Sequence, residues 1–436
     1  MRRSIIGAAF SAQLRRGRLC AIPLLLLAWV AAVAGAQPRA ESITLGRTTA
    51  VVHRPETGTP HVAVLYENGR STGHRMCTEL ALRGFLTLCI NESDTGDNWE
   101  NGALEVKAGV DYARRQKGIT KVILYGHSGG GAIASFYQAV AENGVKFCQD
   151  ARKLSACSGD LASLTPVDGV LFPDAHPGLA VMDLRMINPS VMRDGEKAAA
   201  EPALDPFSPA NGYQAGGKSH YSPEFQQRYF MAQAAVMNQL IAKALQIREQ
   251  ARAGKATDPA TDKVTIPSFG MSCHLGNLDN GIEQFMNTRE PRRLLKNDGT
   301  IATEVIKSVA SGGGFGAGQS PAPSTSTSGH FLSRVAVRAT DSMNGVEYCS
   351  ANTATVCNAQ NIHVPVLFIA AGAGNFIADE ELMYQTSPAK DKEFIVVEGA
   401  THGGQPCRQC GQSPEQYANS ERNMYDYIAS WVNKRF

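Results

Sequence analysis

The stretch Lys121-Val-Ile-Leu-Tyr-Gly-His-Ser-Gly-Gly-Gly131 decides the fold that we expect for this chain. Four of its first five residues are aliphatic or aromatic, and Gly118 and Gly126 bound the run, which favours a short buried strand. A helical pattern follows from about Ala132 to Glu142 and ends before Gly144. The stretch therefore predicts a strand that turns sharply into a helix.

The turn itself reads Gly126-His-Ser-Gly-Gly130, which fits the motif G-x-S-x-G. A serine on such a turn stands clear of the sheet, and small residues are needed two positions away because the backbones pass too closely for side chains. A phosphate-binding loop is the competing interpretation, but this turn lacks the Lys-Ser or Lys-Thr pair that ends one. We therefore expect Ser128 to be a nucleophile.

A serine hydroxyl is a poor nucleophile unless a base takes its proton, and the expected base is a histidine on the loop after the last strand. The run from Lys392 to Val397 predicts that strand, and Gly399-Ala-Thr-His402 follows it. A lone histidine is often a structural residue. Here the place after a strand, with the nucleophile early and the histidine late in the chain, favours His402 as the base.

The chain around these motifs alternates β-rich runs with helical patterns, which is typical of a parallel sheet covered by helices. The expected strands begin at His61, Phe85, Lys121, Val167 and Val364. We therefore expect an α/β fold, with helices on a mostly parallel central sheet.

The alternation stops near Gly178 and resumes near Val364. The region between them contains a long helix that should start at Ser222-Pro223, and we interpret the whole as a mainly helical or irregular cap above the strand ends. A Gly-rich and then Ser-, Thr- and Pro-rich stretch at 308–329 should be a mobile loop. The expected segments are a signal peptide at 1–36, a first part of the core at 37–178, the cap at 179–363 and the rest of the core at 364–436.

The first residues have the layout of a signal peptide. Basic residues precede an apolar run from Ala21 to Val33, and Ala34-Gly-Ala36 follows it, so we expect cleavage after Ala36. The run is shorter than the roughly 20 residues that a membrane-spanning helix needs. We expect a secreted or periplasmic protein without a stable membrane anchor. Because 42 basic residues nearly balance 40 acidic ones, we expect no nucleic-acid partner.

Nine cysteines remain after the expected cleavage, and eight of them form close pairs in the sequence. In an oxidising compartment such pairs favour loop-closing disulfides. The pairs are Cys77 with Cys89, Cys148 with Cys157, Cys349 with Cys357 and Cys407 with Cys410, leaving Cys273 over. The last pair also has zinc-knuckle spacing, but no second Cys or His pair completes such a site, so we favour the disulfide.

On the G-x-S-x-G turn, His402 and the alternating pattern, the chain resembles the α/β-hydrolase superfamily from about Val51 to Asp174 and from Val364 to Phe436, though not in the cap. The resemblance implies an eight-stranded, mostly parallel sheet and hydrolysis through an acyl-enzyme. It also implies an oxyanion hole built from the backbone N–H of Gly129 and of the Asn68-Gly69-Arg70 turn.

The acid of the expected triad is where the chain departs from the family pattern. Counting from Gly372 to the usual position of the acid gives Asn375, and an amide does not stabilise an imidazolium as a carboxylate does. We favour Asp174, which follows the strand after the nucleophile helix, with Glu381 as the alternative acid. Asp379 and Glu380, beside Glu381, are further candidates. We interpret His176 as a pocket or structural residue and not as a second base.

These features predict an exported carboxylesterase-like serine hydrolase that acts on a small-molecule or polymeric ester and needs no metal ion or organic cofactor. A peptidase, an amidase or a lipase of the same fold are alternatives, since the sequence of the cap does not identify the substrate. A non-catalytic binding protein that lost its acid is a further alternative because of Asn375. The oligomeric state stays open at this point.

Overall fold

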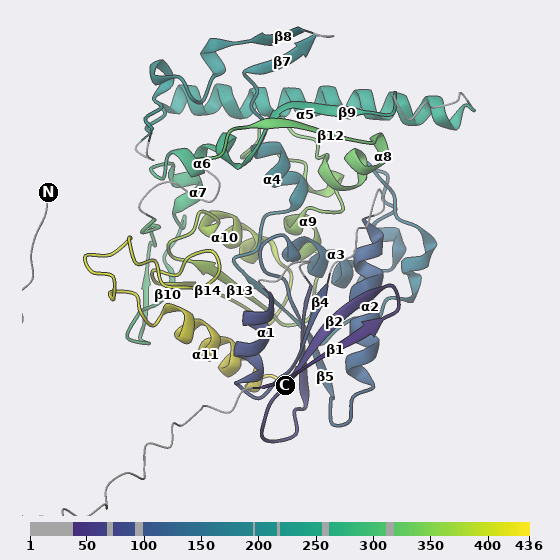
Figure 1. Cartoon of the computed structure of the whole chain (residues 1–436), viewed down its shortest axis with the longest axis vertical. Helices are drawn as coiled ribbons and strands as arrows, with labels where there is room; N and C mark the ends of the chain where they lie inside the picture. Colours follow the sequence, from purple (N-terminus) through teal and green to yellow (C-terminus); the bar gives the residue numbers. More distant parts are fainter. Residues whose placement is uncertain are drawn as a thin grey trace, which may run out of the picture. The chain divides into compact units, whose positions relative to one another are not determined.

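The computed structural model describes residues 38–67, 73–91, 99–194, 197–215, 219–254, 261–310 and 318–436 (Figure 1). The expected signal peptide and the turn at 68–70 lie outside these residues. Within them, no helix combines the length and the apolar character needed to cross a membrane.

A ten-stranded sheet forms the centre of the described chain (Figure 1). Seven neighbouring strands, from β4 to β10 in the sheet, run parallel, and β1–β2, β2–β4 and β10–β11 pair antiparallel. In spatial order the strands are β1 (Arg39–Leu45), β2 (Thr48–Arg54), β4 (Leu86–Asn91), β3 (Val62–Glu67), β5 (Lys121–Tyr125), β6 (Gly169–Pro173), β13 (Val366–Ala371), β14 (Lys392–Val397), β10 (Arg292–Leu295) and β11 (Ile301–Glu304). The expected α/β fold is confirmed.

Alternate side chains of the inner strands are buried on opposite faces of the sheet. In β5, Val122 and Leu124 join the core under α2 (Glu100–Arg114) and α3 (Gly130–Asn143). Ile123 and Tyr125 join the core under α1 (Gly73–Ala81) and α11 (Ser420–Asn433). Both faces are therefore covered, which explains why these strands read as continuous apolar runs.

Most of the expected cap forms its own layer with its own apolar core. In Figure 1, α5 (Pro223–Arg252) lies across this layer together with the paired strands β9 (Val264–Phe269) and β12 (Ala322–Ser326). The other elements are α4 (Leu179–Arg185), the pair β7 (Val191–Asp194) and β8 (Lys197–Ala200), and the short helices α6 (Leu275–Leu278), α7 (Glu283–Met286), α8 (Ser328–His330) and α9 (Thr355–Ala359).

The long helix α5 begins as the sequence predicts. Ser222 caps it by accepting a hydrogen bond from the backbone N–H of Phe225 at 3.2 Å, and Pro223 occupies the first turn. Phe230 and Met237 of this helix are buried, whereas Met231 is 53% exposed and faces away from the layer beneath the helix.

Two parts of the insertion differ from the prediction. Strands β10 and β11 extend the central sheet beyond the eight strands implied by the resemblance, and β10 pairs in parallel with β14. Their short, partly exposed sequences carry little apolar pattern, so the sequence does not reveal them. Within the expected mobile loop at 308–329, β12 pairs with β9, because backbone hydrogen bonds supply the order that apolar burial does not. Residues 311–317 lie outside the described part.

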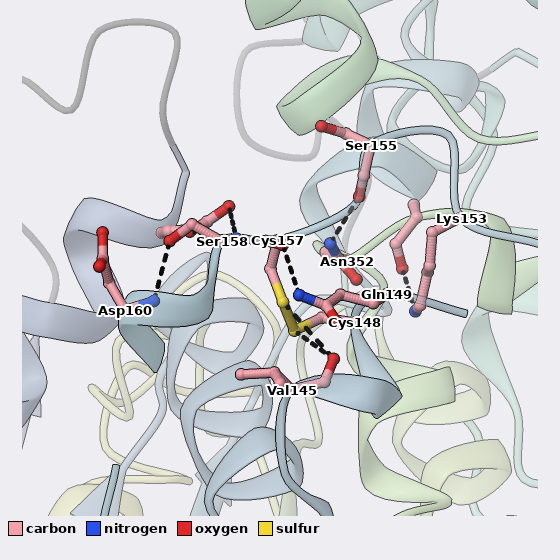
Figure 2. Close-up of a disulfide and its surroundings, with 11 residues drawn as sticks. Val145, Cys148, Gln149, Lys153, Ser155, Cys157, Ser158, Asp160 and Asn352 are labelled. Carbon is pink, nitrogen blue, oxygen red and sulfur yellow. Dashed lines mark hydrogen bonds between the residues drawn. A yellow bond between two sulfur atoms is a disulfide. The ribbon is translucent and has the colours of Figure 1, made fainter. Parts of the chain in front are cut away.

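The four expected disulfides are present, and Cys273 is a buried free thiol. Because Cys407 and Cys410 are bonded to each other, the zinc-knuckle interpretation is excluded. Figure 2 shows Cys148–Cys157, which closes the loop after α3. Asn352, from the returning end of the insertion, donates a hydrogen bond to the carbonyl oxygen of Ser155 in this loop at 2.9 Å. The disulfide loop thus joins the insertion to the core.

Candidate active site

Ser128 occupies a strained turn between β5 and α3. Its φ is +56°, in the left-handed region that residues with a side chain rarely adopt, at a cost of ~1–3 kcal/mol. A Cβ at Gly126 would lie 2.9 Å from Cβ of Ala134, and one at Gly131 would lie 2.7 Å from Cβ of Ala175. Close packing therefore requires glycine at position 126, the first glycine of the G-x-S-x-G pattern, and at position 131, one residue beyond its last glycine.

Three side chains from the carboxyl ends of β5, β6 and β14 meet at this turn. Oγ of Ser128 lies 2.8 Å from Nε2 of His402, and Nδ1 of the same imidazole lies 2.6 Å from Oδ2 of Asp174. Asp174 is 4% exposed, and its Oδ1 accepts a hydrogen bond from the backbone N–H of Ala371 at 2.9 Å. The chain Ser128–His402–Asp174 has the geometry in which an imidazole relays a proton and a carboxylate fixes its tautomer.

The backbone around Asp174 continues β6 past the end of its ladder. Asp174 also has a left-handed φ, +49°, and its carbonyl oxygen accepts a hydrogen bond from the N–H of Ser128 at 3.3 Å. Ser128 and Ala175 form an isolated parallel bridge. Asp174 and Ser128 are therefore connected through the main chain as well as through His402.

The three consecutive acids of α10 (Ile377–Thr386) each bind a different part of the molecule. Asp379 pairs with buried Arg185 at 2.7 Å, and Glu380 accepts a hydrogen bond from the N–H of Ala175. Burial raises the pKa of Glu380 well above its usual value. Glu381, the alternative acid of the sequence analysis, instead accepts hydrogen bonds from Nε of Arg292 and from the N–H of Arg289, each at 2.6 Å. Asp174 and not Glu381 faces His402.

Replacing Glu381 with glutamine is therefore expected to destabilise the protein without removing the carboxylate at His402. Loss of the charge breaks a buried ion pair and leaves the mostly buried Arg292 with its exposed partner Glu290 alone. We expect a fall of about 2–4 kcal/mol in the free energy of unfolding in urea. The kcat for hydrolysis, measured without urea where the variant is folded, should stay within about threefold of the wild-type value. A thousandfold fall in kcat would instead indicate that Glu381 is the acid that acts on His402.

Asn375, at the position where the family places its acid, turns away from His402. Its Nδ2 donates to Oδ1 of Asn277 in α6. The amide thus bridges the end of β13 to the insertion. The carboxylate that contacts His402 comes instead from Asp174, at the end of β6.

The expected oxyanion donors are only partly within the described chain. The N–H of Gly129 forms no hydrogen bond among the described residues and stands at the N-terminal end of α3, where backbone N–H groups and the helix dipole favour negative charge. Gly69 and Arg70 lie outside the described residues. Above Gly129, the side chain of Leu179 comes within 3.1 Å of where a Cβ of Gly129 would lie.

Two further imidazoles surround the Ser128–His402 pair. His127 bonds through Nδ1 to the carbonyl oxygen of Pro173 at 2.8 Å, and burial together with His402 lowers its pKa to about 3. Nε2 of His176 lies 3.1 Å from Oγ of Ser128, and the ring stacks on that of His402 at 5.7 Å between centroids. Burial, and then His402, lower the pKa of His176 well below its usual value.

His176 therefore contacts the side chain of Ser128 directly, a contact that its interpretation as a pocket or structural residue did not specify. The sequence held one signal for this contact. His176 follows Asp174 by two residues, just past the end of the predicted strand that carries the favoured acid.

A phosphate-loop pattern also occurs in the sequence outside this site, but the strand that must precede such a loop is absent from the described residues directly before it. Residues 212–219 fit the phosphate-loop pattern G-x-x-x-x-G-K-[ST], which requires a strand before it. The residues before it form the 3-10 turn Pro209–Asn211 instead, and 216–218 lie outside the described part.

A cavity of about 10 Å³ beside His402 and Asp174 has room for about one water molecule, so it is not a substrate pocket.

The order of the sheet and the strand–turn–helix around Ser128 define the α/β-hydrolase fold. No protein-family model matches the sequence, and no curated protein does.

Solved structures with a similar fold include a hypothetical protein from Pseudomonas aeruginosa, at 15% identity and a TM-score of 0.43, covering 92% of this chain and 95% of that one. Est1E from Butyrivibrio proteoclasticus is similar at 10% identity and a TM-score of 0.39, covering 91% and 98%. The monoacylglycerol lipase of Paleococcus ferrophilus is similar at 12% and 0.36, covering 89% and 99%. At these sequence identities and TM-scores, the activity must be argued from the site alone.

Proposed function

We propose that this protein is an exported serine hydrolase that cleaves carboxylic esters. The observation that carries the proposal is the unbroken chain of contacts from Oγ of Ser128 through His402 to the buried carboxylate of Asp174, at 2.8 and 2.6 Å. The strained turn supports it, because strain of this kind persists where a reactive group must be held in place. Four disulfides and the signal-like first 36 residues support export.

In the proposed reaction, His402 takes the proton of Ser128 as Oγ bonds to the carbonyl carbon, and the carbonyl electron pair moves onto its oxygen. The N–H of Gly129 and a donor from residues 68–70 would hold that oxyanion. His402 then gives the proton to the leaving alkoxide, and Asp174 stabilises the imidazolium between the two transfers. A water activated by His402 hydrolyses the acyl-enzyme and restores the hydroxyl of Ser128.

Esters are the substrate class that this site supports best. A serine triad that cleaves an amide also cleaves the corresponding ester, because an alkoxide leaves more readily than an amide nitrogen. An insertion above the strand ends would enclose more substrate than a bare sheet, so we propose an ester with a substantial acyl or alcohol part.

A matched pair of chromogenic substrates tests the proposal: the p-nitrophenyl ester and the p-nitroanilide of the same acyl group. We expect kcat/KM for the ester to exceed that for the anilide by at least about 100-fold. An anilide cleaved as well as the ester would favour a peptidase or amidase. No turnover of either by folded protein across several acyl lengths would favour a binding protein.

A further inference from the structure

We propose that His176 is a fourth catalytic residue, whose Nε2–H donates a hydrogen bond to Oγ of Ser128 and speeds departure of this oxygen when the acyl-enzyme is hydrolysed. The inference rests on the proposed function, since it assigns a role within the same reaction.

His176 is held on the nucleophile by both its main chain and its ring. Its backbone N–H donates to the carbonyl oxygen of Ser128 at 3.0 Å, while Nε2 lies 3.1 Å from Oγ. The ring lies between that of His402, at 5.7 Å, and that of Phe376, at 4.9 Å. These contacts leave the imidazole little freedom to turn away from Ser128.

The protons of the site decide the direction of this hydrogen bond. Nδ1 of His402 faces a carboxylate and carries the proton, so its Nε2 accepts from the hydroxyl of Ser128. A hydroxyl has one proton, which leaves Oγ only as an acceptor toward His176. Nε2 of His176 must therefore be the protonated nitrogen.

His176 is unsuited to act as a second general base. Its Nδ1 is shielded from solvent and has no hydrogen-bond partner among the described residues, whereas Nδ1 of His402 faces Asp174. No carboxylate is therefore in place to stabilise a protonated His176. The low pKa given above agrees with a ring that stays neutral through the reaction.

A neutral donor on Oγ favours deacylation over acylation. In the free enzyme the hydroxyl oxygen already accepts this bond, so the donor stabilises the ground state of acylation too. In the acyl-enzyme, Oγ is the alkyl oxygen of an ester and accepts weakly. When the second tetrahedral intermediate collapses, the bond from carbon to Oγ breaks, its electron pair goes to Oγ, and His402 returns the proton. The hydrogen bond strengthens as that charge develops, which lowers the deacylation barrier.

Three variants separate this role from a structural one. His176→Phe keeps an aromatic ring against His402 and Phe376 but removes the donor. His176→Gln retains an N–H at about the reach of Nε2. His274→Phe is the matched control, because His274 is also a buried imidazole of lowered pKa but has no hydrogen bond to Ser128. Folding of each variant is compared by circular dichroism and urea unfolding.

The readouts are the pre-steady-state burst of p-nitrophenol and the acyl-enzyme seen by intact-protein mass spectrometry during turnover. For His176→Phe we expect deacylation to slow about 10- to 100-fold while the burst rate changes less, so that acyl-enzyme accumulates. His176→Gln should recover part of the deacylation rate, and His274→Phe should behave as the wild type.

Equal slowing of acylation and deacylation in folded His176→Phe, or no change in either, would overturn the inference. Failure of His176→Gln to improve on His176→Phe would also overturn it. Because acylation is measured separately, these results leave the proposed function intact. A wild type that neither forms an acyl-enzyme nor turns over esters would overturn the function itself and the role of His176 with it.

Discussion

Replacing Ser128 with alanine is expected to lower kcat for ester hydrolysis by roughly 10⁵- to 10⁶-fold, to the level of the oxyanion donors and binding alone. The substitution removes Oγ, the side-chain atom that His402 and His176 contact, and keeps the Cβ that the left-handed φ of +56° already accommodates. The strain of the turn is unchanged, so the free energy of unfolding should fall little or even rise.

His402→Ala provides the partner measurement. Because the serine and the imidazole act as one unit, we expect a similar fall in kcat and little further loss in the double variant. Additive losses in the double variant, or a Ser128→Ala variant that keeps more than about a hundredth of the wild-type rate, would contradict a nucleophile at Ser128.

Replacing Asp174 with asparagine has the second largest expected effect, a fall in kcat of about 10⁴-fold. The amide oxygen can still accept from the N–H of Ala371, which turns the amide nitrogen toward Nδ1 of His402. The imidazole must then carry its proton on Nε2, and it can no longer accept the proton of Ser128. Asparagine tolerates the left-handed φ of +49°, so the fold should survive.

Steady-state kinetics of Asp174→Asn, with circular dichroism for folding, measure this effect. Adding Asn375→Asp to the variant should not restore activity, because residue 375 faces Asn277 and not His402. Restored turnover in that double variant would show that the carboxylate can come from the end of β13. A fall in kcat below tenfold for Asp174→Asn alone would remove Asp174 from the site.

Local patterns placed Ser128 and His402 in one candidate site, and the structure brings their side chains together. The turn at Ser128 is specified by residues within a few positions of it, since close packing at Gly126 and Gly131 excludes any Cβ. His402 follows the strand that ends the alternation. In both cases the signal lies in the sequence neighbours of the residue itself, so no knowledge of distant contacts is needed.

For the acid of the expected triad, the sequence offered several candidate residues and could not decide between them. Asp174 and Glu381 both follow predicted strands, so the sequence places both near the carboxyl edge of the sheet. Only the contacts in the structure show which of the two faces His402. Glu381 forms an ion pair with Arg292 instead. That arginine lies in β10, a strand too short and too polar to be predicted from the sequence. The contact between His176 and Ser128 was not predicted for a related reason, because it depends on the chain after Pro173 bridging Ala175 with Ser128.

The insertion shows the same limit at a larger scale. Its long helix carries a capping serine and a proline in the first turn, and so its start was predicted. The strands β10, β11 and β12 owe their order to partners far away in the chain, β14 and β9, which no local pattern reveals.

Labelling with a fluorophosphonate, followed by peptide mass spectrometry, tests the central claim most directly. The reagent phosphonylates a serine only where a neighbouring base and an oxyanion site activate it. We predict one adduct, on Ser128, which is absent from Ser128→Ala and forms far more slowly in Asp174→Asn. Folded wild-type protein that takes up no label, or that carries it on another residue, would contradict the assignment of Ser128, His402 and Asp174 as the catalytic triad.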